Sequence, residues 1–180
     1  MTGGNKSRKA LWAGERSDFK RGFTLYELLV VLAIVSLLSV MVVARFRAGQ
    51  KNYALANAKQ AFVATVRQAQ SMATSGTEMP GYDTIGGYGV YVQSANSYIL
   101  FFNTNSGKEH QGGSGSVAIN TVNLTNEITV SGAGNTIFFL PPQPVTYLNG
   151  ETTLESLDFI FTREGNNQTV RVTKYGSIDY

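Results

Sequence analysis

The sequence predicts an α+β protein in which one long N-terminal helix packs on a small antiparallel β domain. Three observations support this fold class. An apolar run follows Gly22, an amphipathic helical pattern continues from it to residue 76, and the composition then changes to the Gly, Thr, Asn, Ser, Tyr and Phe residues that are typical of short strands and turns. The 180 residues suffice for one modest domain and a membrane segment.

The first half of the predicted helix has the length of a membrane span. No residue from Leu28 to Ala44 is charged, and this stretch corresponds to about 26 Å of helix. Counted from Phe23, the apolar stretch measures about 33 Å, which matches a bilayer core of about 30 Å. Glu27 is its only ionisable group, and a carboxylate at the centre of a bilayer would cost about 2.5–3.5 kcal/mol. Glu27 therefore requires a functional reason and a positive partner.

The second half of the predicted helix is amphipathic. Apolar residues recur there at three- and four-residue spacing: Leu55, Ala58, Phe62, Val66, Ala69 and Ala73. Lys51, Lys59, Arg67 and Gln70 are predicted on wetter faces, and Thr74-Ser75-Gly76 is a predicted helix stop. We therefore expect the second half to pack against a domain, while the first half is apolar all round.

The remaining residues predict a sheet domain. The strands are expected at Tyr88–Val92, Tyr98–Asn103, Val117–Asn120, Glu127–Ser131, Thr136–Leu140, Leu157–Arg163 and Thr169–Tyr175. A hairpin connection is expected at 164–168, a turn at Tyr175-Gly176, a mobile loop at 106–116 and an extended excursion at the prolines of 141–144. Tyr82, Tyr88, Tyr91 and Tyr98 are expected in the core rather than on an aromatic contact surface.

Charge and composition exclude several classes of function. Residues 1–22 have a net charge of +4 and residues 23–180 a net charge of −1, so the high pI belongs to the N-terminal segment and a nucleic-acid partner is not expected. The chain has no cysteine, which excludes disulfides and thiolate chemistry. His110, the only histidine, is expected to be a solvated loop residue, and no serine–histidine–carboxylate set is evident, so we expect no enzymatic activity.

Cofactor and metal sites are not expected either. The glycines of Gly86-Gly87-x-Gly89 do not precede a predicted helix, as a dinucleotide site requires. Asp158 and Asp179 lack the clustered acidic ligands of a calcium site.

Three interpretations of the apolar segment compete. A secretory signal peptide could be cut after Val42-Val43-Ala44, but two arginines follow almost at once. A plain membrane anchor leaves Gly22 and Glu27 unexplained. The third interpretation is that Lys20 to Glu27, Lys-Arg-Gly-Phe-Thr-Leu-x-Glu, resembles the class III signal of type IV prepilins and type II secretion pseudopilins. This interpretation accounts for every residue of the motif.

The resemblance implies a pathway of processing. A prepilin peptidase that is also an N-methyltransferase would cut between Gly22 and Phe23 and methylate the new N-terminus. Thr24 and Glu27 would then act in assembly, with Glu27 pairing to the amine of a neighbouring Phe23. Loss of one partner of such a buried pair costs about 3–5 kcal/mol, and only one axial offset brings the two charges together. Before assembly, Glu27 could also reach the cytoplasmic headgroups.

The resemblance also implies an organisation and a location. Residues 1–22 would be a cleaved leader, 23–44 the transmembrane and assembly helix, 45–76 its amphipathic continuation and 77–180 the β domain of a pilin-like fold. The protein would span the inner membrane once, with the leader cytoplasmic and the β domain periplasmic or extracellular, and could move into a filament. Its partners would be the peptidase, other pilins or pseudopilins, the inner-membrane assembly platform and membrane lipid.

A looser resemblance concerns the β domain. The order of Phe138-Phe139-Leu140-Pro141, a turn near Gly150 and a terminal hairpin is similar to minor pseudopilins of the H and FimT-like group. Two other functions stay open: a monomeric membrane-anchored binding module in DNA uptake or adhesion, and a membrane-anchored enzyme.

Overall fold

The computed structural model describes residues 23–83, 85–113, 115–125, 127–142 and 145–180, apart from the side chains of residues 43–51. Within these ranges it contains one helix and nine strands, and every strand pairing is antiparallel. The predicted α+β class is confirmed. Two compact units divide the chain, Met1–Ala44 and Arg45–Tyr180, and helix α1 (Leu25–Ser75) contributes to both.

Helix α1 ends at the predicted stop. Gly76 adopts a left-handed backbone conformation, with φ of 59°. The amide of Thr77 donates to the carbonyl of Met72 at 3.2 Å, and the amide of Gly76 donates to the carbonyl of Ala73 at 3.4 Å. These two bonds form a Schellman cap, which satisfies carbonyls that the last helical turn would otherwise leave free.

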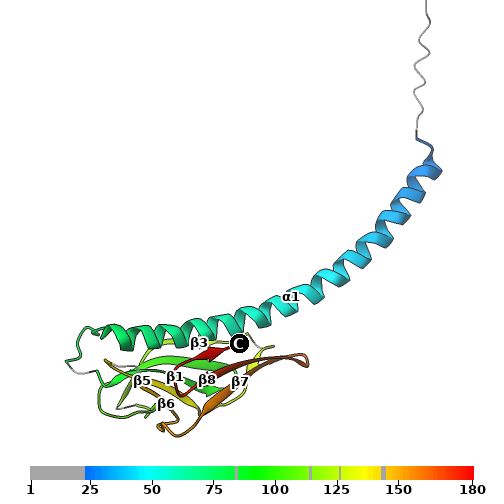
Figure 1. The fold of residues 1–180 in the computed structure, drawn as a ribbon. Coiled ribbons are helices and arrows are strands. Elements are labelled where there is room, and N and C mark those ends of the chain that lie inside the picture. Colours follow the sequence, from blue (N-terminus) through cyan, green and yellow to red (C-terminus); the bar gives the residue numbers. More distant parts are fainter. Residues whose placement is uncertain (1–22, 84, 114, 126, 143–144) are drawn as a thin grey trace, which may run out of the picture. The chain divides into compact units, whose positions relative to one another are not determined.

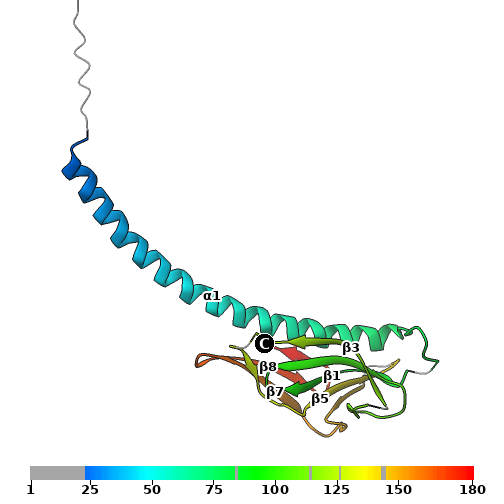
Figure 2. The same ribbon diagram turned by 180° about the vertical axis from the view of Figure 1, so that it is seen from behind.

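The predicted apolar face of α1 packs against the β domain. Five of its six residues are buried, namely Leu55, Phe62, Val66, Ala69 and Ala73, and Ala58 is half-buried beside them. Arg67 is exposed as predicted, whereas Lys59 and Gln70 are half-buried. The Gln70 amide lies close to the terminal hairpin, where it donates to the carbonyl of Gly176 at 3.4 Å. Figures 1 and 2 show this part of α1 lying along the strands, with β3 (Ser116–Asn123) beside it.

The larger sheet has five strands in the order β3-β2-β1-β5-β6. The other members are β1 (Gly87–Ser94), β2 (Ser97–Asn103), β5 (Thr136–Leu140) and β6 (Val145–Leu148). Strands β1, β2, β3 and β5 were predicted, and β5 has the predicted bounds. Strand β6 was not predicted, because four residues after a proline cluster carry too short a pattern.

The connection before β6 differs from the prediction. Leu140 pairs with Val145, so β5 and β6 form a hairpin, and the expectation that the chain leaves the sheet here is wrong. The Pro141–Pro142 bond is cis. Pro141 and Pro142 follow the end of β5, and Pro144 lies outside the described residues.

The smaller sheet has four strands in the order β4-β7-β8-β9. These are β4 (Thr129–Val130), β7 (Ser156–Arg163), β8 (Asn166–Thr173) and β9 (Ile178–Asp179). The predicted five-residue connection at 164–168 is wrong. Glu164 and Gly165 alone make the turn, with φ of 49° and 83°, because positive φ at both positions suits the twist of a two-residue hairpin.

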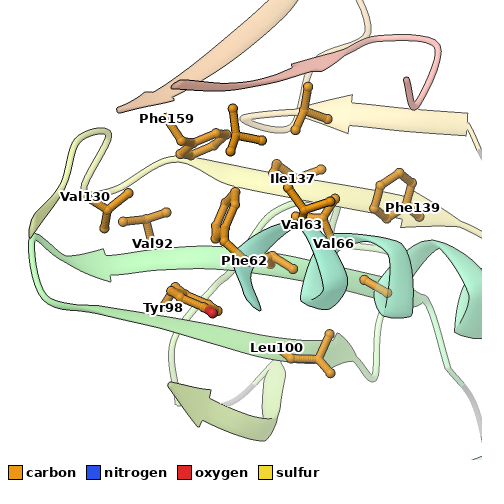
Figure 3. Close-up of a cluster of buried hydrophobic side chains, with 14 of the residues drawn as sticks. Phe62, Val63, Val66, Val92, Tyr98, Leu100, Val130, Ile137, Phe139 and Phe159 are labelled. Carbon is orange, nitrogen blue, oxygen red and sulfur yellow. The ribbon is translucent and has the colours of Figure 1, made fainter. Parts of the chain in front are cut away.

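The core lies between α1 and the two sheets, with Phe62 at its centre (Figure 3). The Phe62 ring contacts Tyr98 edge-on, with centroids 5.1 Å apart, and lies 5.0 Å from Phe159 and 5.4 Å from Phe161. Phe62 thus joins the helix to both sheets, because Tyr98 belongs to β2 and the two phenylalanines belong to β7.

The four tyrosines that were expected in one core lie in different environments. Tyr88 and Tyr98 are fully buried, as the alternation of strand positions predicts. Tyr82 lies before β1 and is 42% exposed. Tyr91 is half-buried in a second apolar cluster, which does not include the core residues around Phe62. Strand alternation therefore placed only two of the four side chains correctly.

The expectation that His110 is a solvated loop residue is wrong in part, because this loop residue is half-buried. Its ring stacks on Tyr91, with centroids 4.3 Å apart and planes inclined by 3°, and meets Phe101 edge-on at 5.0 Å. The described residues of its loop before Ser116 form no strand, as predicted, but several side-chain hydrogen bonds hold the loop in place. Long-range packing onto β1 and β2 explains the burial, and this packing leaves no local pattern in the sequence.

Candidate processing and assembly site

The N-terminus of α1 is built by a helix cap. The hydroxyl of Thr24 accepts a hydrogen bond from the amide of Glu27 at 3.2 Å, and the carbonyl of Thr24 accepts one from the amide of Leu28 at 3.2 Å. Thr24 is therefore the N-cap residue, and Glu27 stands at the third helical position. The sequence Thr-x-x-Glu at this place is a capping-box pattern, in which the two side chains accept hydrogen bonds from free backbone amides at the start of the helix.

The helix also favours a negative charge at this end. Glu27 is the acidic residue of the first turn of α1, and its side chain is exposed. A carboxylate in a first helical turn is stabilised by about 0.3–1 kcal/mol, because the free amide groups give this end a partial positive charge. The end of its own helix therefore stabilises the Glu27 carboxylate, which remains accessible to a second positive group.

An apolar segment of membrane length follows directly. The window Leu25–Val42 has a mean hydropathy of 2.5, and none of it is buried within the chain. Its 18 residues measure about 27 Å as a helix. The hydroxyls of Ser36 and Ser39 donate to the carbonyls of Leu32 and Val35, each at 2.7 Å. These two serines thus satisfy their donors inside the helix, as a hydrocarbon environment requires.

After Gly22, the chain thus has an aromatic residue, a threonine helix cap, a glutamate in the first turn and an uncharged span. Residues 19–43 match the prokaryotic N-terminal methylation motif. The methylation motif is the class III signal of type IV pilins and pseudopilins, so the resemblance of Lys20 to Glu27 to that signal is confirmed. The comparisons with curated proteins and with solved structures found no match.

The methylation motif carries coarse functional information. It implies processing by a prepilin peptidase and assembly with other pilins. Together with the apolar part of α1, it fits a protein anchored in a membrane by one span. The match ends at residue 43, so it describes the signal and the span and does not extend into the β domain.

The structure brings together three of the four residues singled out for processing and assembly. Phe23 and Thr24 directly precede α1 and Glu27 lies in its first turn, and Phe23 is 78% exposed. Gly22 lies outside the described residues. Sequence reasoning chose Thr24 from the signal alone and missed its role as a helix cap. The Thr-x-x-Glu spacing before an apolar run was the signal that could have revealed it.

The other candidate residues take structural positions. Asp158 is held by Arg171 in a two-pronged ion pair, with Nε–Oδ1 and Nη2–Oδ2 distances of 2.7 and 2.8 Å. Arg171 lowers the pKa of Asp158 by hydrogen bonding, and the Asp158 carboxylate is thereby occupied. The glycine run enters β1, where the Phe101 ring covers Gly89 closely. Among the described residues, no group of three or more metal-ligating side chains is assembled.

Proposed function

We propose that this protein is a minor structural subunit of a type IV pilus or a type II secretion pseudopilus. The observation that carries the proposal is the methylation motif in register with a capped, membrane-length helix. A prepilin peptidase cleaves between Gly22 and Phe23 and methylates the amine of Phe23. The role is structural and not enzymatic, and the looser resemblance of the β domain favours a minor pseudopilin of the H and FimT-like group.

Cleavage creates the positively charged partner that Glu27 lacks in the encoded chain. The nitrogen of Phe23 is an uncharged amide before cleavage and a cationic amine afterwards. In a filament core, helices pack together and water is excluded, so the modest stabilisation of Glu27 by its own helix end no longer offsets its burial. The amine of a neighbouring Phe23 supplies a full positive charge. Processing and assembly are then two steps of one mechanism.

The same pair sets the axial register between subunits. The Thr24 cap fixes the backbone of the first turn, and so fixes the direction in which Phe23 leaves the helix. A neighbouring helix that is displaced by one turn, about 5.4 Å, places its amine out of reach of Glu27. We therefore assign Thr24 the role of a positioning residue and Glu27 the role of the assembly contact.

The amphipathic half of α1 connects this assembly element to the β domain. The leader stays cytoplasmic, the span lies in the inner membrane, and the β domain faces the periplasm or the exterior until the subunit moves into a filament. Its partners are the peptidase, other pilins or pseudopilins, the inner-membrane assembly platform and membrane lipid. Burial of Phe62 and Val66 at the helix–domain contact supports a domain that moves together with its helix.

Mass spectrometry of protein extracted from membranes tests the processing step. We expect an N-terminal peptide that begins with N-methylated Phe23 in cells that contain a prepilin peptidase. In peptidase-deficient cells we expect the intact leader. An N-terminus at another residue, or a leader that persists in both strains, refutes the proposed cleavage.

Glu27 variants test the assembly step and separate a subunit from a monomeric anchored module. The chain has no cysteine, so Ser36→Cys introduces a single site for cross-linking between neighbouring helices. We expect cross-linked multimers in the Ser36→Cys protein, their loss in the Ser36→Cys, Glu27→Gln double variant, and partial retention with Glu27→Asp, which keeps the charge. Absence of cross-linked multimers in all three processed proteins favours the monomeric module for DNA uptake or adhesion, whereas equal cross-linking in all three refutes the assembly role of Glu27.

A further inference from the structure

Strand β3 lies at an open edge of the larger sheet, because among the described residues it pairs with β2 on one side and with no strand on the other. Its eight residues, Ser-Val-Ala-Ile-Asn-Thr-Val-Asn, contain no charged residue and no proline. The other strands at sheet edges are shorter, since β6 has four residues and β4 and β9 have two each. Proteins usually protect a long edge with a charge, a proline or a cover, because its backbone groups can pair with another chain.

The second half of β3 presents free backbone groups at this edge. Its pairing with β2 is regular over residues 120–123. Beyond them, the amide of Leu124 donates to the carbonyl of Asn96 at 2.7 Å, so these two residues form a hydrogen-bonded pair. Hydrogen-bonded pairs alternate with non-bonded pairs in an antiparallel ladder, and Thr121 and Asn123 therefore direct their backbone groups away from β2. Both residues are exposed, and no described residue pairs with these outward groups.

An apolar groove lies beside this half of β3 and has a volume of about 370 Å³. We call it the edge groove. Three alanines of α1 line it, together with apolar residues at and after the end of β3: Ala54, Ala58, Ala61, Val122, Leu124 and Ile128. None of the residues that line the edge groove is charged. The alanine side chains end at Cβ, and they therefore leave space between the helix and the strand.

The free edge and the edge groove meet at Val122. Its side chain lines the groove, while its neighbours Thr121 and Asn123 carry the free backbone groups. In sites where a peptide adds a strand to a sheet, main-chain hydrogen bonds supply affinity and pockets for alternate side chains supply specificity. Residues 116–125 and the groove lining contain no charge, so a charged segment would lose its water here without gaining a partner. The site therefore favours an uncharged partner.

We propose that the free edge of β3 and the edge groove bind an extended, uncharged segment of another protein, which adds a strand to the larger sheet and inserts an apolar side chain between β3 and α1. A second copy suits the site less well. The amphipathic half of α1 lies along the strands (Figures 1 and 2), so antiparallel β3–β3 pairing would point the helices of the two copies in opposite directions, although both would enter the membrane by the same end of α1. The site uses neither Phe23 nor Glu27 and is separate from the proposed assembly contact.

Peptide selection on the full-length chain in detergent micelles tests the chemistry of the partner. The probe is a phage-displayed library of random octapeptides, and the enriched peptides are synthesised and their dissociation constants measured by fluorescence anisotropy. We expect uncharged sequences rich in β-branched and aromatic residues, because these fit a pleated, half-buried strand. A selection that enriches no sequence, or that enriches charged sequences, overturns the proposal.

Two substitutions at one position test the backbone contact. Thr121→Pro removes an amide that points away from β2 and adds a ring at the free edge, so the affinity for the selected peptide should fall at least about tenfold. Thr121→Val is the matched control, because it keeps the amide and should leave the affinity unchanged. In the unsubstituted chain, the amides of Thr121 and Asn123 should exchange with deuterium rapidly without peptide and slowly with it. Equal affinities in the two variants, or no protection of these amides, refute pairing with β3.

A pair of alanine variants tests the edge groove, and it remains informative if Thr121→Pro does not fold. Ala61 and Ala64 are both exposed residues of α1, but only Ala61 lines the groove. Ala61→Leu should weaken peptide binding at least about fivefold by filling the groove, whereas Ala64→Leu should not change it. Equal binding by these two variants contradicts a role for the groove.

Analytical ultracentrifugation of the chain without peptide distinguishes the partner from a second copy. We expect no association that depends on β3. Dimers that dissociate in Thr121→Pro but persist in Thr121→Val would assign the free edge to a second copy and overturn the proposed partner. None of these measurements depends on cleavage at Gly22 or on filament assembly, so a failed docking site and a failed proposed function are distinguishable.

Discussion

Replacement of Phe62 by alanine should largely uncouple α1 from the β domain. Phe62 is fully buried, and its ring contacts one aromatic residue of β2 and two of β7. Among the residues of α1 whose side chains are described, no other aromatic residue is buried, since Tyr26 and Tyr53 are both exposed. Phe62→Ala therefore removes the largest apolar group through which the helix holds both sheets.

The expected loss of stability follows from these contacts. Removal of a buried phenylalanine side chain forfeits about 1.5–3 kcal/mol of transfer free energy. The cavity left among three rings adds to this loss, and the measured range for such substitutions is about 3–5 kcal/mol. A domain stability of about 5–15 kcal/mol would thus fall by roughly a fifth or more. The midpoint of urea unfolding should drop by about 2 M, because the slope is about 1–3 kcal/mol per molar urea.

Urea titration of the detergent-solubilised chain, followed by far-ultraviolet circular dichroism, measures this change. Tyr53→Ala is the matched control, because Tyr53 is also an aromatic residue of α1 but is 73% exposed. Its substitution should change the free energy of unfolding by about 0.5 kcal/mol or less. Similar midpoints for Phe62→Ala and Tyr53→Ala would refute the central position of Phe62 in the core.

Two further predictions concern the β domain. Gly89→Ala should destabilise it by about 1–3 kcal/mol, measured by the same urea titration, because an added Cβ would lie 2.6 Å from the Ile137 carbonyl and 2.8 Å from the Phe101 ring. The Asp158–Arg171 pair lowers the pKa of Asp158, so its contribution to stability is present above the ordinary value of 3.8 and is lost as the pH falls through the folded pKa. Asp158→Asn should therefore narrow the difference in urea midpoint between neutral and strongly acidic solution, and an unchanged difference would contradict this assignment.

The sequence predicted α1 well because the relevant signals are local. The three- and four-residue spacing of Leu55 to Ala73 selected the buried face, since one side of a helix repeats at this interval. Gly76 marked the stop because glycine readily adopts the left-handed conformation of a Schellman cap. The capping function of Thr24 was also readable from its spacing to Glu27, but it was recognised only from the hydrogen bond.

The β domain was less predictable because its pairings are not local. Strand β6 has four residues, and its position is decided by pairing with β5. The hairpin at Glu164-Gly165 looked longer because the polar residues 166–168 resemble a loop, although they pair with β7. His110 lies in a glycine-rich segment with the composition of a solvated loop, and only the apolar outer face of the sheet explains its burial.

The sequence by itself therefore determined the processing signal, the membrane-length span, the fold class and the helix face that packs on the domain. These features depend on residue type and spacing within a few turns of one helix, or on composition. Only the tertiary structure decided how the sheets pair, that Phe62 joins the helix to both of them, and that His110 packs on Tyr91 and Phe101 of the larger sheet. Those features depend on contacts between residues far apart in the chain, and such contacts form only when the strands have been brought together.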